Sequence, residues 1–321
     1  MANNINTPIL NDYSLFTIDQ HPMISIRHDV FLAVAQQKSF SKASQVLYIS
    51  QPAISKHIKS LEEYYKTKLF DRKGIHIELT PAGKLLFEKL TEVKRIQEQT
   101  EFELSGINDV MQAKGVLKLG ASTTVALYIL PKVLSSFNQH YPQINISLLN
   151  RNSEIVLEAL LNGDIDLGII EGPVKRANIN HKPFLTDQVV AVCSKKSPIA
   201  KRKTYAVKEL IHMPIAIRER GSGTLAALKQ TLEKNKIKLS QLNIKVRLGG
   251  TEALKNFLIE SDSLGFLPNR SVLKEIKYGE LTVIHFEGLH IERNFYFIQR
   301  KGENSGLNKI FIKLAQQIYN V

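Results

Sequence analysis

The 321-residue chain has one cysteine and no tryptophan, and no apolar run approaches the roughly 18 residues that a bilayer-spanning helix needs. The single cysteine, Cys193, excludes an internal disulfide framework and suits a reducing compartment. It lies in the apolar run VVAVCS, so we expect a buried, unreactive thiol. Residues 1–22 contain neither Lys nor Arg, which argues against a signal peptide. These absences predict a cytoplasmic protein that makes no membrane contact.

The motifs of common enzyme classes are also missing. The sequence contains no GxSxG, HExxH, Walker A or strand-linked GxGxxG motif, and its nine histidines are dispersed without metal-ligand spacing. We therefore predict no catalytic residue, no cofactor and no metal site.

Positive charge is distributed unevenly along the chain. The net charge is +13, but residues 24–110 hold 13 basic and 11 acidic residues, so the excess lies beyond residue 110. A basic chain favours polyanionic partners. Here the bulk charge alone does not identify a nucleic-acid-binding segment. Part of the excess is expected to be a solvated loop, namely Lys195, Lys196, Lys201, Arg202 and Lys203.

The N-terminal quarter follows a helix, helix, helix, hairpin pattern over residues 24–80. Ser39 or Ser41 can cap the second helix, and Ser50 can cap the third, with Pro52 in its tolerant first turn. Two short extended runs around residues 73–74 predict a hairpin. Residues 1–23 are polar and are expected to form a mobile extension. Translation from Met1 and from Met23 both remain open.

The third helix, residues 51–65, has two distinct faces at 100° per residue. Its apolar side chains are expected inside, and the opposite face carries Gln51, Pro52, Ser55, Lys56 and Lys59. Gln, Ser and Lys suit base-edge and phosphate contacts in a major groove. Arg72 and Lys73 lie on the hairpin, where a wing would meet DNA. A polar face can be merely solvated, but three helices with a basic hairpin favour a DNA-binding unit.

A long helix is expected over residues 81–111. Apolar residues recur on it at alternating spacings of three and four, which is a heptad seam. The candidate dimerisation residues are Leu86, Leu90, Val93, Leu104 and Ile107. The alternative is that this face packs on its own chain.

Beyond Gly115 the chain alternates strands and helices, which predicts an α/β region with a mostly parallel sheet. Its length suits two lobes: lobe I from residues 112–170 and 269–321, and lobe II from residues 171–268. Hydroxyl-bearing residues follow several strands, at turns where helix N-termini attract anions. The candidate ligand-facing residues at these turns are Ser122, Thr123, Thr124, Ser222, Thr224 and Thr251. Each one alone is more often a simple N-cap, and it is their recurrence at several strand ends that favours a shared cleft.

Two charged residues join this candidate site. Arg218 lies before one of the turns and could pair with a carboxylate or sulfate. Glu171 lies at an expected lobe crossover near residues 170–172, the second crossover being near residues 266–268. It is either a solvated hinge residue or an acceptor for an ammonium group of the ligand.

The stretch from FLAVAQQKSF through SQPAISKHIKSLEE to LTPAG resembles the LysR-type transcriptional regulators, and GVLKLGASTT, LLNGDIDLGII, RERGSGT and GFLP extend the resemblance to about residue 320. It implies an N-terminal winged helix-turn-helix, a long linker helix, and a C-terminal, two-lobed effector domain like type 2 periplasmic binding proteins. By matching position, Ser39, Ser41 and Ser50 lie near phosphates. Lys56 stands where Arg is common, so the bidentate Arg contact is not expected there.

The resemblance also implies partners. Members bind palindromic operator DNA as dimers or tetramers and respond to small molecules, and RNA polymerase is a further candidate partner. The GASTT, YILPKVL and YPQI segments most resemble the branch that regulates carbon dioxide fixation and sulfur assimilation, which suggests an anionic effector. A solute-binding protein would share the two-lobed domain. It would need an export signal, however, and would not carry a DNA-binding unit.

Overall fold

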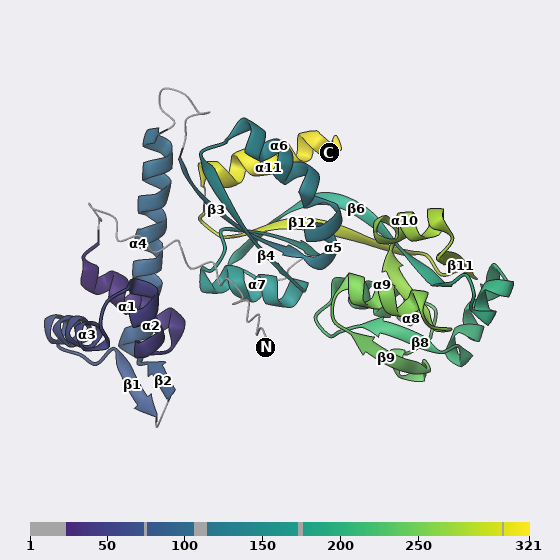
Figure 1. Ribbon diagram of the computed structural model, residues 1–321, viewed down its shortest axis with the longest axis horizontal. Helices are drawn as coiled ribbons and strands as arrows, with labels where there is room; N and C mark the ends of the chain where they lie inside the picture. The colour runs from purple at the N-terminus through teal and green to yellow at the C-terminus, as the bar shows by residue number, and fades with distance from the viewer. Residues whose placement is uncertain (1–23, 74–75, 106–113, 173–175, 304) are drawn as a thin grey trace, which may run out of the picture. The chain divides into compact units, whose positions relative to one another are not determined.

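The computed structural model describes residues 24–73, 76–105, 114–172, 176–303 and 305–321 (Figure 1). The chain divides into unit 1, which ends at Glu101, and unit 2, Phe102–Val321. The expected extension at residues 1–23 and residues 106–111 of the expected linker helix lie outside the described residues. Each unit is described by itself.

Unit 1 is a bundle of three short helices with a hairpin and a long helix, as the sequence predicts. Ser39 accepts a hydrogen bond from the backbone N–H of Lys42 at 3.2 Å, and Ser50 accepts one from that of Ala53 at 3.4 Å, so the hydroxyls cap the second and third helices. The elements are α1 Ile26–Gln37, α2 Phe40–Leu47, α3 Gln51–Tyr65, β1 Phe70–Lys73, β2 His76–Leu79 and α4 Pro81–Ser105.

The LTPAG segment has a specific structural role at the start of α4. The Thr80 hydroxyl donates to the carbonyl of Lys68 at 2.7 Å and accepts from the backbone N–H of Gly83 at 2.9 Å. A Cβ atom at Gly83 would lie 2.1 Å from the carbonyl oxygen of Leu69, so only glycine fits. This contact fixes the direction in which α4 leaves the hairpin.

The heptad seam of α4 divides into two parts. Leu86 and Leu90 pack into the core of unit 1 with Phe31, Ile54 and other apolar residues, and Leu90 is 6% exposed. For Leu90 the structure therefore shows the alternative, packing on its own chain, whereas Leu86 is only half-buried against the same core. Val93 and Leu104 remain exposed at 37% and 62%, as do Leu85 and Ile96. Ile107 lies outside the described residues.

Unit 2 is built on one mixed sheet with the strand order β4-β3-β5-β12-β6-β10-β8-β9. Strand β11 also pairs with β6, and β7 pairs with β11. The strands are β3 Gly115–Ser122, β4 Ile144–Arg151, β5 Leu167–Glu171, β6 Ile179–Ser194, β7 Thr204–Ala206, β8 Ile215–Arg218, β9 Ile244–Leu248, β10 Leu264–Pro268, β11 Leu281–Glu287 and β12 Ile291–Arg300. The parallel pairings expected from the sequence occur inside each half, for example β3 with β4 and β8 with β9. The two long strands β6 and β12 pair antiparallel with each other and join the halves.

Helices cover both halves of this sheet. They are α5 Thr123–Tyr128, α6 Leu130–His140, α7 Ser153–Asn162, α8 Gly223–Lys234, α9 Thr251–Ile259, α10 Asn269–Tyr278 and α11 Gly306–Tyr319, with short 3-10 helices η2 Pro198–Lys201, η3 Val207–His212 and η4 Leu239–Gln241. Asn152 caps α7 by accepting from the backbone N–H of Ile155 at 3.0 Å.

Separate cores define the two lobes, and β6 and β12 run from one to the other (Figure 1). Phe184 of β6 and Phe295 of β12 belong to the lobe I core, whereas Val189 and Ile291 belong to that of lobe II. Both expected crossovers, near residues 170–172 and near residues 266–268, are corrected. Phe184 still packs in the lobe I core, so the chain enters lobe II along β6 and not at residue 171. Helix α10 and strand β11 stay in lobe II, because Val272 and Leu281 pack with the buried side chains of α9 and β10 there.

Cys193 lies in the lobe II core, where burial raises the pKa of its thiol to about 11. The thiol is therefore neutral at physiological pH and behaves as a small apolar side chain. Among the described helices, none has the length and apolar character needed to cross a membrane. The described residues also contain no group of three or more His, Cys, Asp or Glu side chains arranged to hold a metal ion.

Candidate functional site

The third helix of unit 1 presents the two faces that the sequence predicts. Ile54, Ile58 and Leu61 are buried. Gln51, Pro52, Lys56 and Lys59 are exposed on the other side, and Ser55 is half-buried among them. The Ser41 hydroxyl of α2 donates to Oε1 of Gln51 at 3.2 Å, so α2 orients the amide at the start of α3.

Lys59, on this face, is lightly constrained. Lys59 Nζ lies 3.8 Å from Glu63 Oε1, a contact that contributes little because both side chains are largely exposed. In the hairpin, Arg72 lies opposite Ile77 and Lys73 opposite His76.

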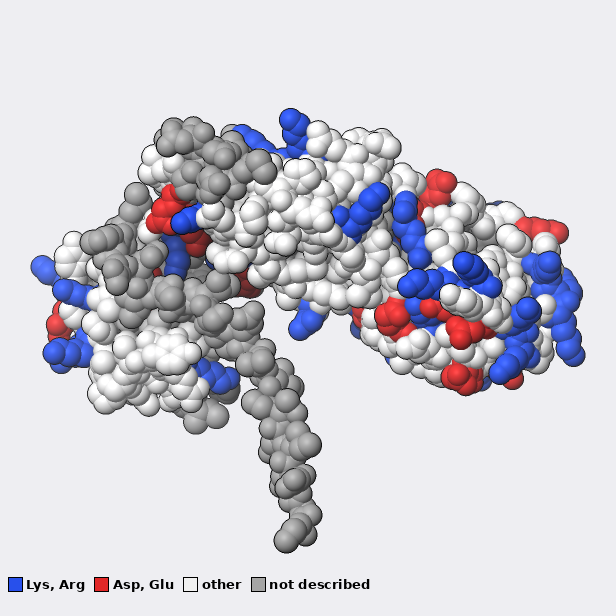
Figure 2. All heavy atoms as spheres, turned by 45° about the horizontal axis from the view of Figure 1, so that its top comes forward, with Lys and Arg blue, Asp and Glu red and all other residues white. Residues whose placement is uncertain are grey.

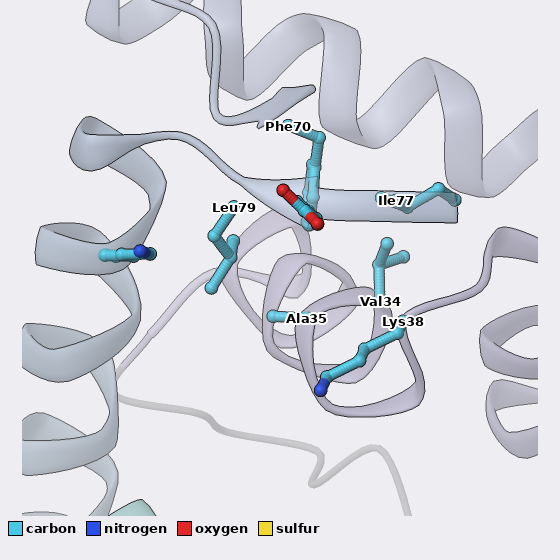
Figure 3. A pocket seen from close by; sticks show the side chains of 8 residues that line it. Val34, Ala35, Lys38, Phe70, Ile77 and Leu79 are labelled. Atoms are coloured by element: carbon cyan, nitrogen blue, oxygen red, sulfur yellow. The ribbon is translucent and has the colours of Figure 1, made fainter. Parts of the chain in front are cut away.

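Unit 1 also contains an open, largely apolar hollow of about 590 Å³ between α1, the hairpin and α4. Figure 3 shows Phe70, Ile77 and Leu79 of the hairpin facing Val34 and Ala35 of α1. Lys38 and Lys84 also line it. Among the residues whose side chains are described, none of those that the sequence singles out for binding lines this hollow.

The candidate effector residues of unit 2 gather around an arginine that sequence reasoning missed. Arg293 of β12 is buried where that strand passes between the lobes. Its Nη1 donates to the Thr224 hydroxyl of lobe II at 2.7 Å, and its Nη2 donates to the Thr124 hydroxyl of lobe I at 3.2 Å. One guanidinium thus joins hydroxyls from both lobes.

Two buried carboxylates compensate the Arg293 charge. Asp187 Oδ2 accepts from Nε at 3.1 Å and from Nη2 at 2.7 Å. Glu171 Oε1 lies 2.8 Å from Nη1, and both of these side chains are nine-tenths or more buried. Asp187 has a second cation, since its Oδ1 lies 3.4 Å from Arg270 Nε. Glu171 is thus a buried ion-pair partner and not a solvated hinge residue.

Glu171 also lies against the first turn of α8. A Cβ atom at Gly223 would come within 2.0 Å of Glu171 Oε2, which explains a glycine at this position. The Ser122 hydroxyl donates to Oε1 at 3.4 Å, whereas Oε2 is buried without a hydrogen-bond partner among the described residues. A carboxylate with a free acceptor therefore lies between the lobes beside a helix N-terminus.

Arg218 is paired inside lobe II. Its Nε and Nη2 donate to the two carboxylate oxygens of Glu219 at 2.7 and 2.9 Å, and its Nη1 donates to the Thr251 hydroxyl at 2.8 Å. Burial alone would raise the pKa of Glu219, but the hydrogen bonds and charge of Arg218, with the backbone N–H of Gly250, hold that pKa below its usual value. Arg218 and Thr251 thus form a pair separate from the Arg293 group.

Thr123 and Ser222 keep their hydroxyls available. Thr123 is half-buried and makes no hydrogen bond within the described residues, and the Ser222 side chain does not cap α8. A further contact between the lobes runs from Asn152 Nδ2 to the carbonyl of Arg220 at 3.4 Å. The charges here balance, since three cations, Arg293, Arg218 and the partly exposed Arg270, face three carboxylates, Asp187, Glu171 and Glu219. The positive field expected from the +13 excess is therefore not concentrated at this site.

Comparison with known proteins identifies both units. The family profile described as "LysR substrate binding domain" matches residues 112–318, and that described as "Bacterial regulatory helix-turn-helix protein, lysR family" matches residues 27–84. The chain is 29% identical to the HTH-type transcriptional regulator CysL of Bacillus subtilis, covering 90% of this chain and 95% of that protein. It is 30% identical to a probable RuBisCO transcriptional regulator of Thalassiosira pseudonana, covering 84% of this chain and 89% of the relative.

A solved structure, the Synechocystis PCC6803 CcmR regulatory domain in complex with 2-PG, is 25% identical with a TM-score of 0.58. It covers 63% of this chain and 96% of that domain. The relatives agree with the carbon dioxide fixation and sulfur branch that the GASTT region predicts. The chain belongs to the LysR family and is a LysR-type DNA-binding transcriptional regulator.

Proposed function

We propose that this regulator reads its operator with the exposed face of α3, using Gln51, Ser55 and Lys56 for base contacts. The support is that these side chains oppose the buried face of the helix and that Ser41 orients the Gln51 amide. Lys59 and the wing residues Arg72 and Lys73 would bind phosphates. Ser39 and Ser50, at the starts of α2 and α3, would lie near phosphates.

The protein is further proposed to act as a dimer or a tetramer on a palindromic site. Exposed apolar side chains on α4, namely Leu85, Val93, Ile96 and Leu104, support a helix-to-helix contact between copies, because water-exposed apolar stripes are unfavourable. Two reading helices would then contact two half-sites. RNA polymerase remains a candidate partner, and no catalytic role is proposed.

The effector is proposed to be a small anion held between the lobes. The observation that carries this proposal is Arg293, a buried guanidinium that joins hydroxyls from both lobes. An anionic group could replace Glu171 at Nη1 of this arginine and use the free Thr123 hydroxyl, while the released Glu171 would accept a donor of the ligand. The 2-PG complex of the related CcmR domain makes 2-PG a suitable first probe.

Replacement of Glu171 by the anion of the effector would couple effector binding to the relative position of the two lobes. The effector would alter the contacts of Arg293 with Thr124 in lobe I and with Thr224 in lobe II, and a free-energy difference of about 1–3 kcal/mol between two lobe arrangements is enough to regulate. A ligand that binds both arrangements equally would have no effect.

The test is calorimetric titration of the full-length protein with 2-PG, sulfate, phosphorylated sugars, O-acetylserine and neutral analogues. Thr123→Val keeps the side-chain shape and removes one hydroxyl, so it should weaken an anionic ligand about tenfold through one hydrogen bond to charge. Thr282→Val, at a half-buried threonine in β11, is the matched control and should leave the affinity unchanged. Tightest binding by a neutral apolar compound, indifferent to Thr123→Val, would contradict the proposal.

A further inference from the structure

The strongest local concentration of positive charge in the chain lies on lobe II. Residues 195–208 contain six Lys or Arg and no Asp or Glu, and Lys195, Lys196, Lys201, Arg202 and Lys203 are all exposed. Figure 2 shows Lys and Arg side chains crowded at the end of unit 2 where Figure 1 places lobe II. We call residues 195–203 the basic turn.

The basic turn has solvent-exposed side chains, as the sequence predicts, and its backbone is ordered. Ser197 accepts from the backbone N–H of Ile199 at 3.2 Å and donates to the carbonyl of Asp262 at 3.2 Å, which ties η2 to lobe II. The Tyr205 hydroxyl donates to the carbonyl of Ile199 at 2.8 Å. The backbone carbonyl of Lys203 accepts from the N–H of His285 at 2.8 Å, which joins the turn to β11. The cations are therefore held on a fixed backbone.

Most of the charge on this turn is uncompensated. Arg202 pairs with Glu209 at 3.0 Å and lies over the ring of Tyr205 at 4.2 Å. Within the described part of the chain, none of the four lysines of the turn has a carboxylate within ion-pair distance. Lys195 Nζ instead lies near the C-terminal end of α10, 3.3 Å from where a Cβ of Gly279 would be. Four neighbouring ammonium groups that repel one another indicate a missing polyanionic partner.

The surroundings of the turn favour nucleic acid over an acidic protein. Specific protein interfaces have an apolar, aromatic-rich centre. Exposed large apolar side chains are absent between residues 176 and 272 of the described chain. Leu273 and Tyr278 of α10 are exposed beyond this range, and Tyr278 adjoins Lys277. A tyrosine hydroxyl is itself a common phosphate ligand. Lysine point charges without an apolar centre suit a regularly charged phosphate backbone, which they bind by counterion release.

We propose that the basic turn of lobe II is a second DNA contact, which binds the phosphate backbone without sequence preference. The inference rests on the DNA-binding function of the chain and goes beyond the contact made by α3. It accounts for why the helix-turn-helix segment carries little net charge while residues 111–321 carry the excess. DNA affinity from this surface is independent of base sequence and strongly dependent on salt.

The experiment measures binding of the full-length protein to a 60-base-pair random-sequence duplex over a range of salt concentrations. The variant Lys196→Gln/Lys201→Gln/Lys203→Gln removes three charges from the turn. Because the slope of log affinity against log salt is about 0.9 per neutralised phosphate, the slope should fall by about two to three and the affinity at low salt at least fivefold. The matched control, Lys301→Gln/Lys309→Gln/Lys313→Gln, removes three exposed lysines of lobe I and should change the slope by less than one.

Each outcome decides between stated alternatives. Equal slopes for the two triple variants, with unchanged melting temperatures, would overturn the lobe II contact. Loss of binding to polyglutamate, with binding to the duplex unchanged, would show that the turn serves an acidic protein instead. Failure of the wild-type protein to bind any duplex at low salt would contradict DNA binding itself, which distinguishes that failure from failure of this inference.

Discussion

Replacement of Arg293 by methionine should destabilise the effector domain strongly. The change removes the cation from two buried carboxylates. Asp187 keeps Arg270 at 3.4 Å, but Glu171 keeps only the 3.4 Å contact with Ser122. Loss of one partner from a buried ion pair costs about 3–5 kcal/mol. In a domain of this size each kcal/mol lowers Tm by about 2–4 °C, so the loss should be about 6–20 °C.

A matched substitution separates burial from the chemistry of the residue. Arg202→Met removes an ion pair of similar length, 3.0 Å to Glu209, but from an exposed site, so it should cost less than about 1 kcal/mol. Adding Glu171→Gln to Arg293→Met removes the orphaned charge and should restore part of the lost stability. Calorimetric melting of the full-length variants measures all three. An Arg293→Met loss no larger than that of Arg202→Met would refute the reasoning.

Three further predictions concern other parts of the molecule. Gln51→Ala should cost about 1–3 kcal/mol of operator binding while random-duplex binding stays the same. An equal loss of affinity for both duplexes in a gel-shift titration would contradict the assignment of this face to base contacts. Leu104→Asp, at an exposed position, should dissociate the oligomer without unfolding the protein, whereas Leu90→Asp should unfold unit 1. Light scattering that shows an intact oligomer for Leu104→Asp would exclude this part of α4 from the contact between copies. Because the pKa of Glu219 is lowered in the folded protein, its pairing with Arg218 stabilises the fold at pH values above the unfolded pKa near 4.3. This stabilisation is lost as the pH falls through the lower folded pKa. Glu219→Gln should therefore melt below wild type at pH 6, with a difference that shrinks below about pH 4; a constant difference would contradict the linkage.

Local sequence signals predicted the DNA-binding unit well. The capping hydroxyls Ser39 and Ser50 and the apolar face of α3 act within a few residues of one another, so the sequence pattern contains their structural cause. The close approach of Gly83 to the Leu69 carbonyl was not predictable in the same way, because it depends on how the hairpin folds back on α4.

Long-range partners explain what the sequence did not predict. The IERNFYFIQR segment was not identified as a strand, although Ile291, Arg293, Phe295 and Phe297 alternate on its buried side. That alternation places a charge on an inward face and so signals a buried partner. Its partners Asp187 and Glu171 are 106 and 122 positions away, and the sequence alone did not bring them together. Heptad spacing similarly cannot distinguish Leu90, buried in its own chain, from Leu104, which is exposed.

The position of the Arg293 group suggests control more than stability. Buried ion pairs contribute little net stability, since desolvation offsets the attraction and apolar replacements often do as well. Their energy depends steeply on geometry, however, and this group takes its hydroxyls from opposite lobes. A small change in lobe position therefore breaks several strong contacts together, whereas an apolar contact would weaken gradually. An effector that supplies its own anion to Arg293 would offset the cost of the broken contacts in one lobe arrangement only. A two-state switch requires such a difference between its two arrangements.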